Sequence, residues 1–153
     1  MPATSAVHIR AATAADLSVV RRLLDEATLP LDGLDERFGD GYAVAEADGA
    51  IVGVEGIEVY GTSGLLRSAA IAPAWRGRGV GDAITRDRIE WARRRGLTAL
   101  YLLTTTASDY FPRFGFGRVE RESAPAGIRS SREFAEACPD SAVCMYLSLG
   151  MET

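Results

Sequence analysis

The chain has 153 residues, of which 47% are hydrophobic and 25% charged, a composition typical of one soluble globular domain spanning residues 1–153. Its formal net charge of -4 argues against nucleic acid as a partner, and no apolar run has the length of a membrane span or the character of a signal peptide. One histidine and two cysteines offer few metal ligands and no disulfide framework, so we expect no metal and a cytoplasmic protein.

The N-terminal segment predicts a strand, a helix and an apolar loop. Residues 7–11 alternate between polar and apolar side chains, as in a half-buried strand. Thr13 and Asp16 have the spacing of a capping box, and apolar residues then recur at helical spacing over 14–28. The apolar loop 29–34 either lines a substrate pocket or plugs the edge of the core.

Three strands joined by tight turns are expected next, at 42–47, 51–60 and 65–72. A turn centred between residues 62 and 63 would place Glu58 directly opposite Arg67. This pair is either a surface ion pair or a partly buried clamp for a substrate. Ser68 would join Arg67 on the same face only if a bulge interrupts the alternation of the strand.

The second half of the chain alternates helices and strands. A glycine-rich loop at 76–81 leads into a helix over 79–95, and the apolar strand over 97–104 is expected to be central and parallel to the strand at 65–72. The other expected elements are a short helix at 109–114, a strand at 116–121, helical character within 124–139, and a last strand at 143–149.

Polar residues follow the carboxyl end of the predicted strand 97–104, where open sheets place their ligands. Thr104 and Ser108 are therefore candidates for contact with a cofactor. Ser108 is also a candidate cap for the short helix that follows.

The loop before the second long helix has the chemistry of an anion site. Gly77, Gly79 and Gly81 lack Cβ atoms, so their backbone N–H groups can converge on one point. The first N–H groups of the helix are unpaired, and Arg76 and Arg78 add positive charge. Phosphate is the usual anion at such a helix start.

The pattern Arg-x-x-Gly-x-Gly formed by Arg76, Gly79 and Gly81 resembles motif A of the GNAT superfamily of acetyl-CoA-dependent N-acetyltransferases. Phe114-Gly115-Phe116 is similar to the late x-Gly-Phe motif of the same family. The predicted order β-α-β-β-β-α-β-α-β-(α)-β matches the family over essentially the whole chain. The resemblance implies an α/β (α+β) domain with a mixed, twisted sheet of about seven strands. Two of its strands, 65–72 and 97–104, would splay around acetyl-CoA.

Further blocks resemble the GNAT subgroup of arsenic-resistance N-acetyltransferases. This resemblance implies an amino-acid-like substrate, with an organoarsenical amino acid as one candidate. Cys138 and Cys144 are interpreted as small buried residues rather than arsenic ligands. The matching blocks are Gly56-Ile57-Glu58-Val59-Tyr60-Gly61, Gly64-Leu65-Leu66-Arg67-Ser68, Leu102-Leu103-Thr104-Thr105-Thr106-Ala107, Tyr110-Phe111, Glu133-Phe134, Cys138-Pro139 and Ser141-Ala142.

The resemblance also implies where acetyl-CoA binds. The backbone of Ala70 and Ile71 would face the acetyl group, and the family's usual Asn at the end of the next parallel strand is replaced by Thr104. The pyrophosphate would lie on the backbone of Arg76, Gly77, Arg78, Gly79, Val80 and Gly81.

Two departures from the family pattern concern catalysis. The usual general-acid tyrosine position holds Phe111, so Tyr110 is the candidate, with packing in the core as the alternative. The position of a common catalytic glutamate holds Leu65, so Glu58 on the neighbouring strand is the candidate base or water-positioning residue. Arg67 and Ser68 are the candidate substrate-binding residues.

These residues lead to one main hypothesis and two alternatives. The main one is transfer of an acetyl group from acetyl-CoA to the primary amine of a small amino-acid-like compound. The alternatives are a protein N-terminal or lysine acetyltransferase, and a catalytically weak acyl-CoA-binding regulatory module. Whether the chain forms a homodimer is left open.

Overall fold

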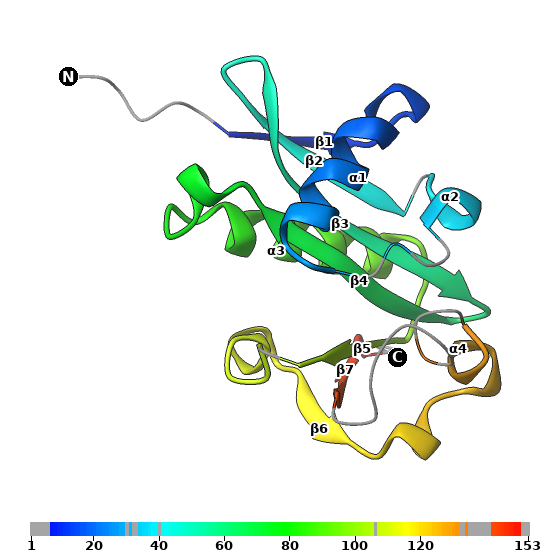
Figure 1. Cartoon of the computed structure of the whole chain (residues 1–153). Helices are drawn as coiled ribbons and strands as arrows, with labels where there is room; N and C mark the ends of the chain where they lie inside the picture. The colour runs from blue at the N-terminus through cyan, green and yellow to red at the C-terminus, as the bar shows by residue number, and fades with distance from the viewer. Residues whose placement is uncertain are drawn as a thin grey trace.

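The computed structural model describes residues 7–29, 31, 34–39, 41–105, 107–131, 134 and 142–150. The strands of this described part form one seven-stranded sheet in the order β1-β2-β3-β4-β5-β7-β6 (Figure 1). Only β4 and β5 pair in parallel, and every other neighbouring pair is antiparallel. The strands are β1 His8–Ala11, β2 Tyr42–Ala47, β3 Ala50–Tyr60, β4 Ser63–Ile71, β5 Ala99–Thr104, β6 Gly117–Val119 and β7 Val143–Ser148.

Helices cover both faces of the sheet. Side chains of α1 pack with Val54 of β3 and Ala70 of β4, whereas α3 packs on the opposite face with Val52 and Ile57 of β3. None of the helices in the described ranges has the length and apolarity needed to cross a membrane. The helices are α1 Leu17–Glu26, α2 Leu34–Arg37, α3 Val80–Arg94 and α4 Ala126–Arg129, and the 3₁₀ turns are η1 Ala14–Asp16, η2 Pro73–Trp75, η3 Phe111–Phe114 and η4 Arg121–Ser123.

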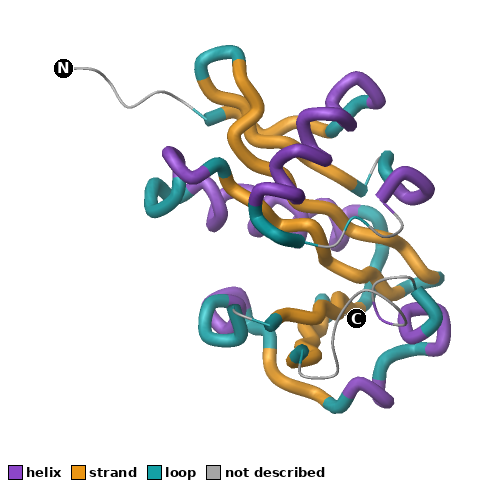
Figure 2. The backbone as a smooth tube through the Cα atoms, in the orientation of Figure 1, coloured by secondary structure: helices purple, strands orange, loops and turns teal. Residues whose placement is uncertain are grey.

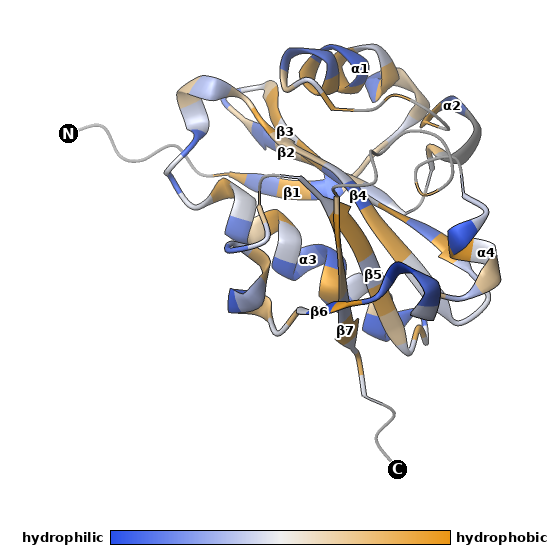
Figure 3. Cartoon of the chain, turned by 60° about the horizontal axis from the view of Figure 1, so that its bottom comes forward, coloured by the Kyte–Doolittle hydropathy of each residue, from blue (hydrophilic) through white to orange (hydrophobic). Residues whose placement is uncertain are grey.

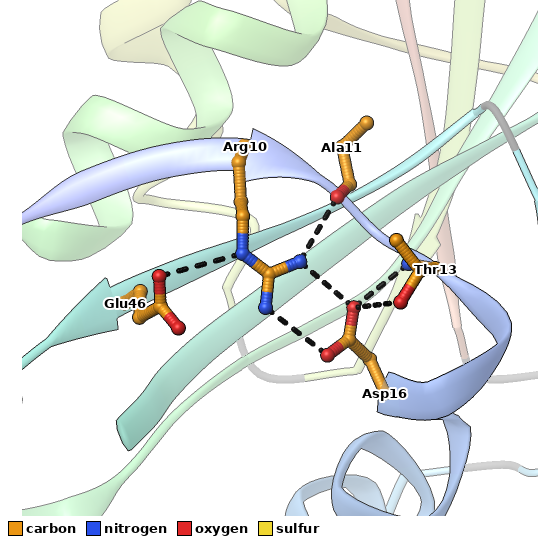
Figure 4. Close-up of polar contacts among 5 residues, drawn as sticks. All are labelled: Arg10, Ala11, Thr13, Asp16 and Glu46. Carbon is orange, nitrogen blue, oxygen red and sulfur yellow. Dashed lines mark hydrogen bonds and ion pairs between the residues drawn. The ribbon is translucent and has the colours of Figure 1, made fainter. Parts of the chain in front are cut away.

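The capping box predicted at the start of the first helix is confirmed, and hydrogen bonds connect it to β1 (Figure 4). Asp16 Oδ2 accepts a hydrogen bond from the Thr13 backbone N–H at 2.7 Å. The same carboxylate accepts two hydrogen bonds from Arg10 of β1, at 2.9 and 3.1 Å. The Arg10 guanidinium holds the pKa of Asp16 down at about 2. The first turn of the predicted helix is η1, and α1 begins at Leu17.

The predicted register of the β3–β4 hairpin is wrong by two residues. Tyr60 pairs with Ser63, so Gly61 and Thr62 form the turn, and Gly61 takes the left-handed φ of 66° that such a turn requires. Glu58 therefore lies opposite Leu65 rather than Arg67. Because strands alternate with a period of two, Glu58 and Arg67 remain on one face as diagonal neighbours and still meet.

The parallel pairing of β4 with β5 is confirmed but short. It covers only Ser63, Gly64 and Leu65 against residues 99–101, after which the two strands diverge. Strands β1 to β4 and strands β5 to β7 consequently form two groups that separate from one another (Figure 2). Apolar residues concentrate along β5 and β7, and hydrophilic residues lie on the outer side of α1 (Figure 3).

The C-terminal third agrees with the predictions in part. The strand expected at 116–121 is the shorter β6, and the short helix is η3, preceded by Tyr110 rather than capped by Ser108. Within 124–139 the described helix is α4, whereas the helical character expected around 132–137 falls almost entirely outside the described residues. Cys144 is buried as expected, and Cys138 lies outside the described residues.

Candidate active site

A cavity of about 750 Å³ occupies the opening between β4 and β5. Its wall includes Thr28 and Leu29 from the end of α1, Arg67 from β4, and Asp82 and Thr85 from α3. Because α1 and α3 lie on opposite faces, the cavity passes through the sheet. Leu29 in the loop after α1 lines the cavity and also packs against the core under α1. The core interpretation of this loop is confirmed for Leu29, and its contact with a substrate stays a prediction.

A bulge in β4 shapes the centre of the cavity. Val54 pairs with Ala70 and Gly56 with Arg67, so the single residue Glu55 of β3 faces two residues, Ser68 and Ala69. Ser68 has a φ of 64°, a left-handed conformation that a serine adopts rarely. The bulge brings Ser68 Oγ to 3.0 Å from Arg67 Nε, which donates to it. The bulge on which the Ser68 prediction depended is thus present.

Arg67 and Glu58 form a buried ion pair. Arg67 Nη1 donates to Glu58 Oε2 at 3.0 Å, and the two side chains are 0% and 2% exposed. The Tyr60 hydroxyl donates to the other carboxylate oxygen of Glu58 at 2.6 Å. Arg67 lines the cavity, whereas Glu58 stands behind it with both oxygens engaged. This arrangement orients the guanidinium toward the cavity.

The glycine-rich loop forms the end of the cavity at the start of α3. Gly77 and Gly79 have φ values of 76° and 86°, and Gly79 is the N-cap of α3. A Cβ on either glycine would meet nothing within 4 Å, so the space above the loop is open. The N–H groups that begin an α-helix have no partner within it, and they suit a phosphate placed in that space.

The two arginines of this loop differ in position. The exposed Arg76 lines the cavity, and its Nε donates to the carbonyl of Ile71 at the end of β4. Arg78 instead lies over the ring of Trp75, with its guanidinium carbon 5.0 Å from the ring centroid, and does not line the cavity. Arg76 is thus the loop cation better placed to meet a ligand.

Tyr110 lies at the cavity wall with its hydroxyl directed at α3. The hydroxyl donates to Asp82 Oδ1 at 2.8 Å, and the Arg113 guanidinium covers the ring at 4.4 Å. Burial and the Asp82 carboxylate raise the pKa of Tyr110 above its ordinary value. Phe111 also touches the cavity but is packed among Tyr110, Phe114 and Phe116. The hydroxyl at this site is therefore supplied one position before the usual family position.

The other predicted cofactor residues fall into two groups. Ile71, Gly77, Gly79, Gly81 and Thr104 line the cavity. Thr104 Oγ1 also accepts the backbone N–H of Ala107 at 2.9 Å, which fixes the turn after β5. The residues that do not line the cavity are Ala70 and Val80, which are buried, and Ser108, which contacts Arg118.

Sequence reasoning missed Glu55. This side chain is 0% exposed, lies against the cavity, and accepts a hydrogen bond from Thr85 Oγ1 of α3 at 2.7 Å. Burial raises its pKa to about 8. The signal in the sequence was a glutamate amid small and apolar residues in a strand, where the alternation of β3 places it on the α3 face.

No cluster of three or more metal-ligating side chains occurs in the described part of the chain. The cavity is lined by glycine backbone at the start of α3, where helix N–H groups have no partner within the helix, and by Arg67 and Tyr110. These groups fit a long anionic ligand whose phosphates lie at α3 and whose other end lies at the bulge of β4.

Solved structures that contain coenzyme A share this fold. N-acetylglutamate synthase from Neisseria gonorrhoeae, complexed with coenzyme A and N-acetyl-glutamate, superposes with a TM-score of 0.81 and 20% identity over 97% of this chain and 36% of that one. Rv2747 from Mycobacterium tuberculosis, in complex with CoA and NLQ, has a TM-score of 0.77 and 25% identity over 92% of this chain and 98% of that one. The chain therefore has the fold of these coenzyme A-bound proteins.

The model of the acetyltransferase (GNAT) family matches residues 12–116, and the chain belongs to this family. An amino-acid acetyltransferase from Aeromonas salmonicida is 30% identical over 129 residues, which are 79% of this chain and 29% of the relative. One from Pseudomonas putida is 34% identical over 98 residues, 62% of this chain and 22% of the relative. The chain thus spans less than a third of the length of these curated relatives.

Proposed function

We propose that this protein is an acetyl-CoA-dependent N-acetyltransferase that acetylates the primary amine of a small amino acid. The observation that carries the proposal is one continuous cavity with a glycine-rich helix start at one end and the buried Arg67 guanidinium in its wall. The amino-acid acetyltransferases among its relatives support the choice of substrate class.

Different groups along the cavity would bind different parts of acetyl-CoA. The backbone at Gly77, Gly79 and Gly81 would hold the pyrophosphate of acetyl-CoA, which supplies the thioester as acyl donor. The backbone of Ile71, which lines the cavity beyond the bulge, would face the acetyl group and stabilise charge on its oxygen, whereas Ala70 does not line the cavity. This geometry orients the thioester for attack by an amine bound between β4 and the loop after α1.

Arg67 and Ser68 would recognise the substrate carboxylate. A guanidinium pairs with a carboxylate through two parallel hydrogen bonds, which a lysine cannot reproduce. Glu58 and Tyr60 hold Arg67 in place, and in this proposal Glu58 serves as a positioning residue. A second role of Glu58, attracting an ammonium proton through water, remains a prediction.

The test compares an α-amino acid with the amine formed by removing its carboxyl group. Thiol release from acetyl-CoA is measured for both substrates with wild type and with Arg67→Lys, which keeps a positive charge beside Glu58. We expect the KM for the amino acid to rise about tenfold or more, because the bidentate contact is lost, and the KM for the amine to change little.

An equal rise in KM for both substrates would exclude Arg67 as the residue that binds the substrate carboxylate. Failure of the wild type to bind coenzyme A or to release thiol with any amine would overturn the enzymatic proposal. Preferential acetylation of peptides would favour the protein acetyltransferase alternative.

We further propose that the amino acid acceptors include organoarsenical amino acids. The support is the set of sequence blocks between residues 56 and 142 that resemble the arsenic-resistance subgroup. The same thiol-release assay would compare such a compound with its arsenic-free analogue. A higher kcat/KM for the arsenical is expected, and equal values would leave a general amino acid acetyltransferase.

A further inference from the structure

Three hydrogen-bonding side chains lie together on the α3 face of the sheet, across the opening from the face that carries Arg67. Glu55 comes from β3, Thr85 from α3, and Tyr110 from the residues after β5. Thr85 Oγ1 donates to Glu55 Oε1 at 2.7 Å, and its hydroxyl also interacts with the Tyr110 hydroxyl. The three groups form a line from a buried carboxyl to the wall of the cavity.

The burial of Glu55 is complete, since the residue is 0% exposed, and its Oε2 atom has no hydrogen-bond partner among the described residues. A lone carboxylate in such surroundings is unfavourable, and protonation removes the negative charge that burial penalises. Burial raises its pKa to about 8, although the hydrogen bond from Thr85 and the charge of Arg88 oppose the rise. Burial therefore favours the protonated form of Glu55 at pH values where an ordinary glutamate is ionised.

The charged surroundings of Glu55 come from α3 and the turn after β5. On α3, Arg88 favours the carboxylate and Asp87 disfavours it, and from the other side the Tyr110 hydroxyl faces it through Thr85. The residues opposite Glu55 on β2 and β4 carry no charge, and they are Ala43, Ser68 and Ala69.

The surroundings of Tyr110 disfavour loss of its hydroxyl proton. Its hydroxyl donates to Asp82, and the nearby carboxylate and burial disfavour the phenolate. If a leaving group took the phenol proton, the phenolate would lie beside the negative charge of Asp82. Rapid return of a proton to Tyr110 would remove that penalty.

We propose that Glu55 is the proton store behind Tyr110, connected to it by Thr85, for the thiolate that leaves when acetyl-CoA is consumed. The inference rests on the proposed function. In the free protein the Thr85 hydroxyl donates to Glu55 and the Tyr110 hydroxyl donates to Asp82. The relay requires both hydroxyls to rotate, so that protonated Glu55 donates to Thr85, Thr85 donates to Tyr110 and Tyr110 donates to the sulfur. As the carbon–sulfur bond breaks, the sulfur takes the Tyr110 proton, Tyr110 takes the Thr85 proton, and Thr85 takes the Glu55 proton. An S–H bond has then formed, and Glu55 is a carboxylate that regains a proton before the next turnover.

The position of Glu55 favours this role over that of base for the amine. Its side chain is fully buried in the free protein and lies on the opposite face of the sheet from Arg67. An amino acid held by its carboxylate at Arg67 would thus reach the thioester from the other side. Glu55 acts through Thr85 and Tyr110 and is a positioning residue for the proton rather than a catalytic residue.

Infrared spectroscopy tests the proton store without relying on activity. The 153-residue chain, free and saturated with coenzyme A, is titrated from pH 6 to pH 10, and the wild-type spectrum is compared with that of Glu55→Gln. We expect a protonated carboxyl band that persists at neutral pH, is lost as pH rises through about 8, and is missing in the variant. A carboxyl that is fully ionised at pH 7 in both states would overturn the inference.

Kinetics test the relay. We expect Glu55→Gln and Thr85→Val each to lower kcat about tenfold or more with little change in the KM for acetyl-CoA, and Thr85→Ser to restore most of kcat. Wild-type kcat should fall above the pKa of Glu55, and Glu55→Gln should lack that fall. A wild-type kcat and a wild-type pH profile in both variants would overturn the relay. If Glu55→Gln does not fold, the kcat and pH profile of Thr85→Val test the relay instead.

The two proposals fail in different ways. Absence of coenzyme A binding or thiol release in the wild type removes the proposed function, whereas the infrared titration still reports whether Glu55 holds a proton. Normal thiol release with unaffected Glu55 and Thr85 variants removes only the proton store.

Discussion

Glu55 and Glu58 lie three positions apart on β3, so the alternation of the strand places them on opposite faces of the sheet. Glu58 is engaged by Arg67 and Tyr60, whereas Glu55 accepts one hydrogen bond from Thr85 and its other oxygen has no partner in the described part of the chain. Two identical side chains in one strand thereby acquire different chemistry. One orients a cation, and burial raises the pKa of the other.

At this scale Tyr110 gives a direct prediction. Tyr110→Phe should lower kcat by about tenfold to a hundredfold, because the leaving sulfur loses its proton donor, with little change in the KM for acetyl-CoA. Steady-state thiol release measures both constants. A wild-type kcat would mean that the thiolate leaves unaided or that another group donates the proton.

At the scale of elements, the start of α3 depends on left-handed glycine residues. Gly79 has a φ of 86°, where a side chain is strained, and its missing Cβ leaves the space above the loop open. Gly49 in the β2–β3 turn has a similar φ of 78° and open space but does not line the cavity. Substitutions at these two glycines therefore separate the effect of backbone strain from the effect of obstructing the cavity.

We expect Gly79→Val to abolish binding of coenzyme A, since the added side chain blocks approach of the pyrophosphate to the backbone. Gly49→Val should lose about 1–2 kcal/mol of stability from the same backbone strain and keep coenzyme A binding. Calorimetric titration with coenzyme A and urea denaturation measure the two effects. Unchanged binding by Gly79→Val would contradict the assignment of the loop.

The junction of β1 and α1 has a pH-dependent stability. The pKa of Asp16 falls from 3.8 to about 2 because Arg10 and the Thr13 N–H bind its carboxylate. A lowered pKa stabilises the fold at pH values above 3.8, and the stabilisation is lost as pH falls toward 2. Asp16→Asn should therefore cost about 1 kcal/mol at pH 7 and progressively less toward pH 2.

Urea denaturation across this pH range measures the difference in unfolding free energy between Asp16→Asn and wild type. Asp35→Asn is the matched control, because Asp35 pairs with Arg21 at an exposed position and should cost at most a few tenths of a kcal/mol. A pH-independent effect of Asp16→Asn would show that the charge of Asp16 is not what stabilises the junction.

At the scale of the molecule, the sheet is held together at its centre by only three parallel residue pairs between β4 and β5. The cavity lies where the two groups of strands separate, and residues of both groups line it. A ligand that fills this cavity touches both groups and should stabilise the whole fold.

Coenzyme A at a hundred times its Kd should stabilise the fold by about 2.7 kcal/mol, which corresponds to a rise in Tm of roughly 5–10 °C for a domain of this size. Hydrogen exchange should slow in both β4 and β5. Differential scanning calorimetry with wild type and with Gly79→Val separates specific binding from a general salt effect. A rise of equal size in the variant would contradict binding at the loop.

Much of the fold follows from short-range signals in the sequence. The alternation of strands, the capping box at Thr13 and Asp16, and the left-handed glycines near residues 77–81 act over a few residues, and each predicted element boundary depended on them. The same signals predicted that Glu58 and Arg67 share a face, because a register error of two residues preserves the alternation.

The tertiary structure decided what depends on residues far apart in the chain. The bulge at Ser68 appears only where β4 pairs with β3, and it places Glu55 opposite two residues of the cavity wall. The packing of α3 on that face brings Thr85 to Glu55 and Asp82 to Tyr110. The sequence by itself determined the family motif and the order of elements, since these are local patterns. The complete burial of Glu55, which raises its pKa, arises from the long-range packing of α3 on the sheet, whereas the local pattern indicates only the face on which Glu55 lies.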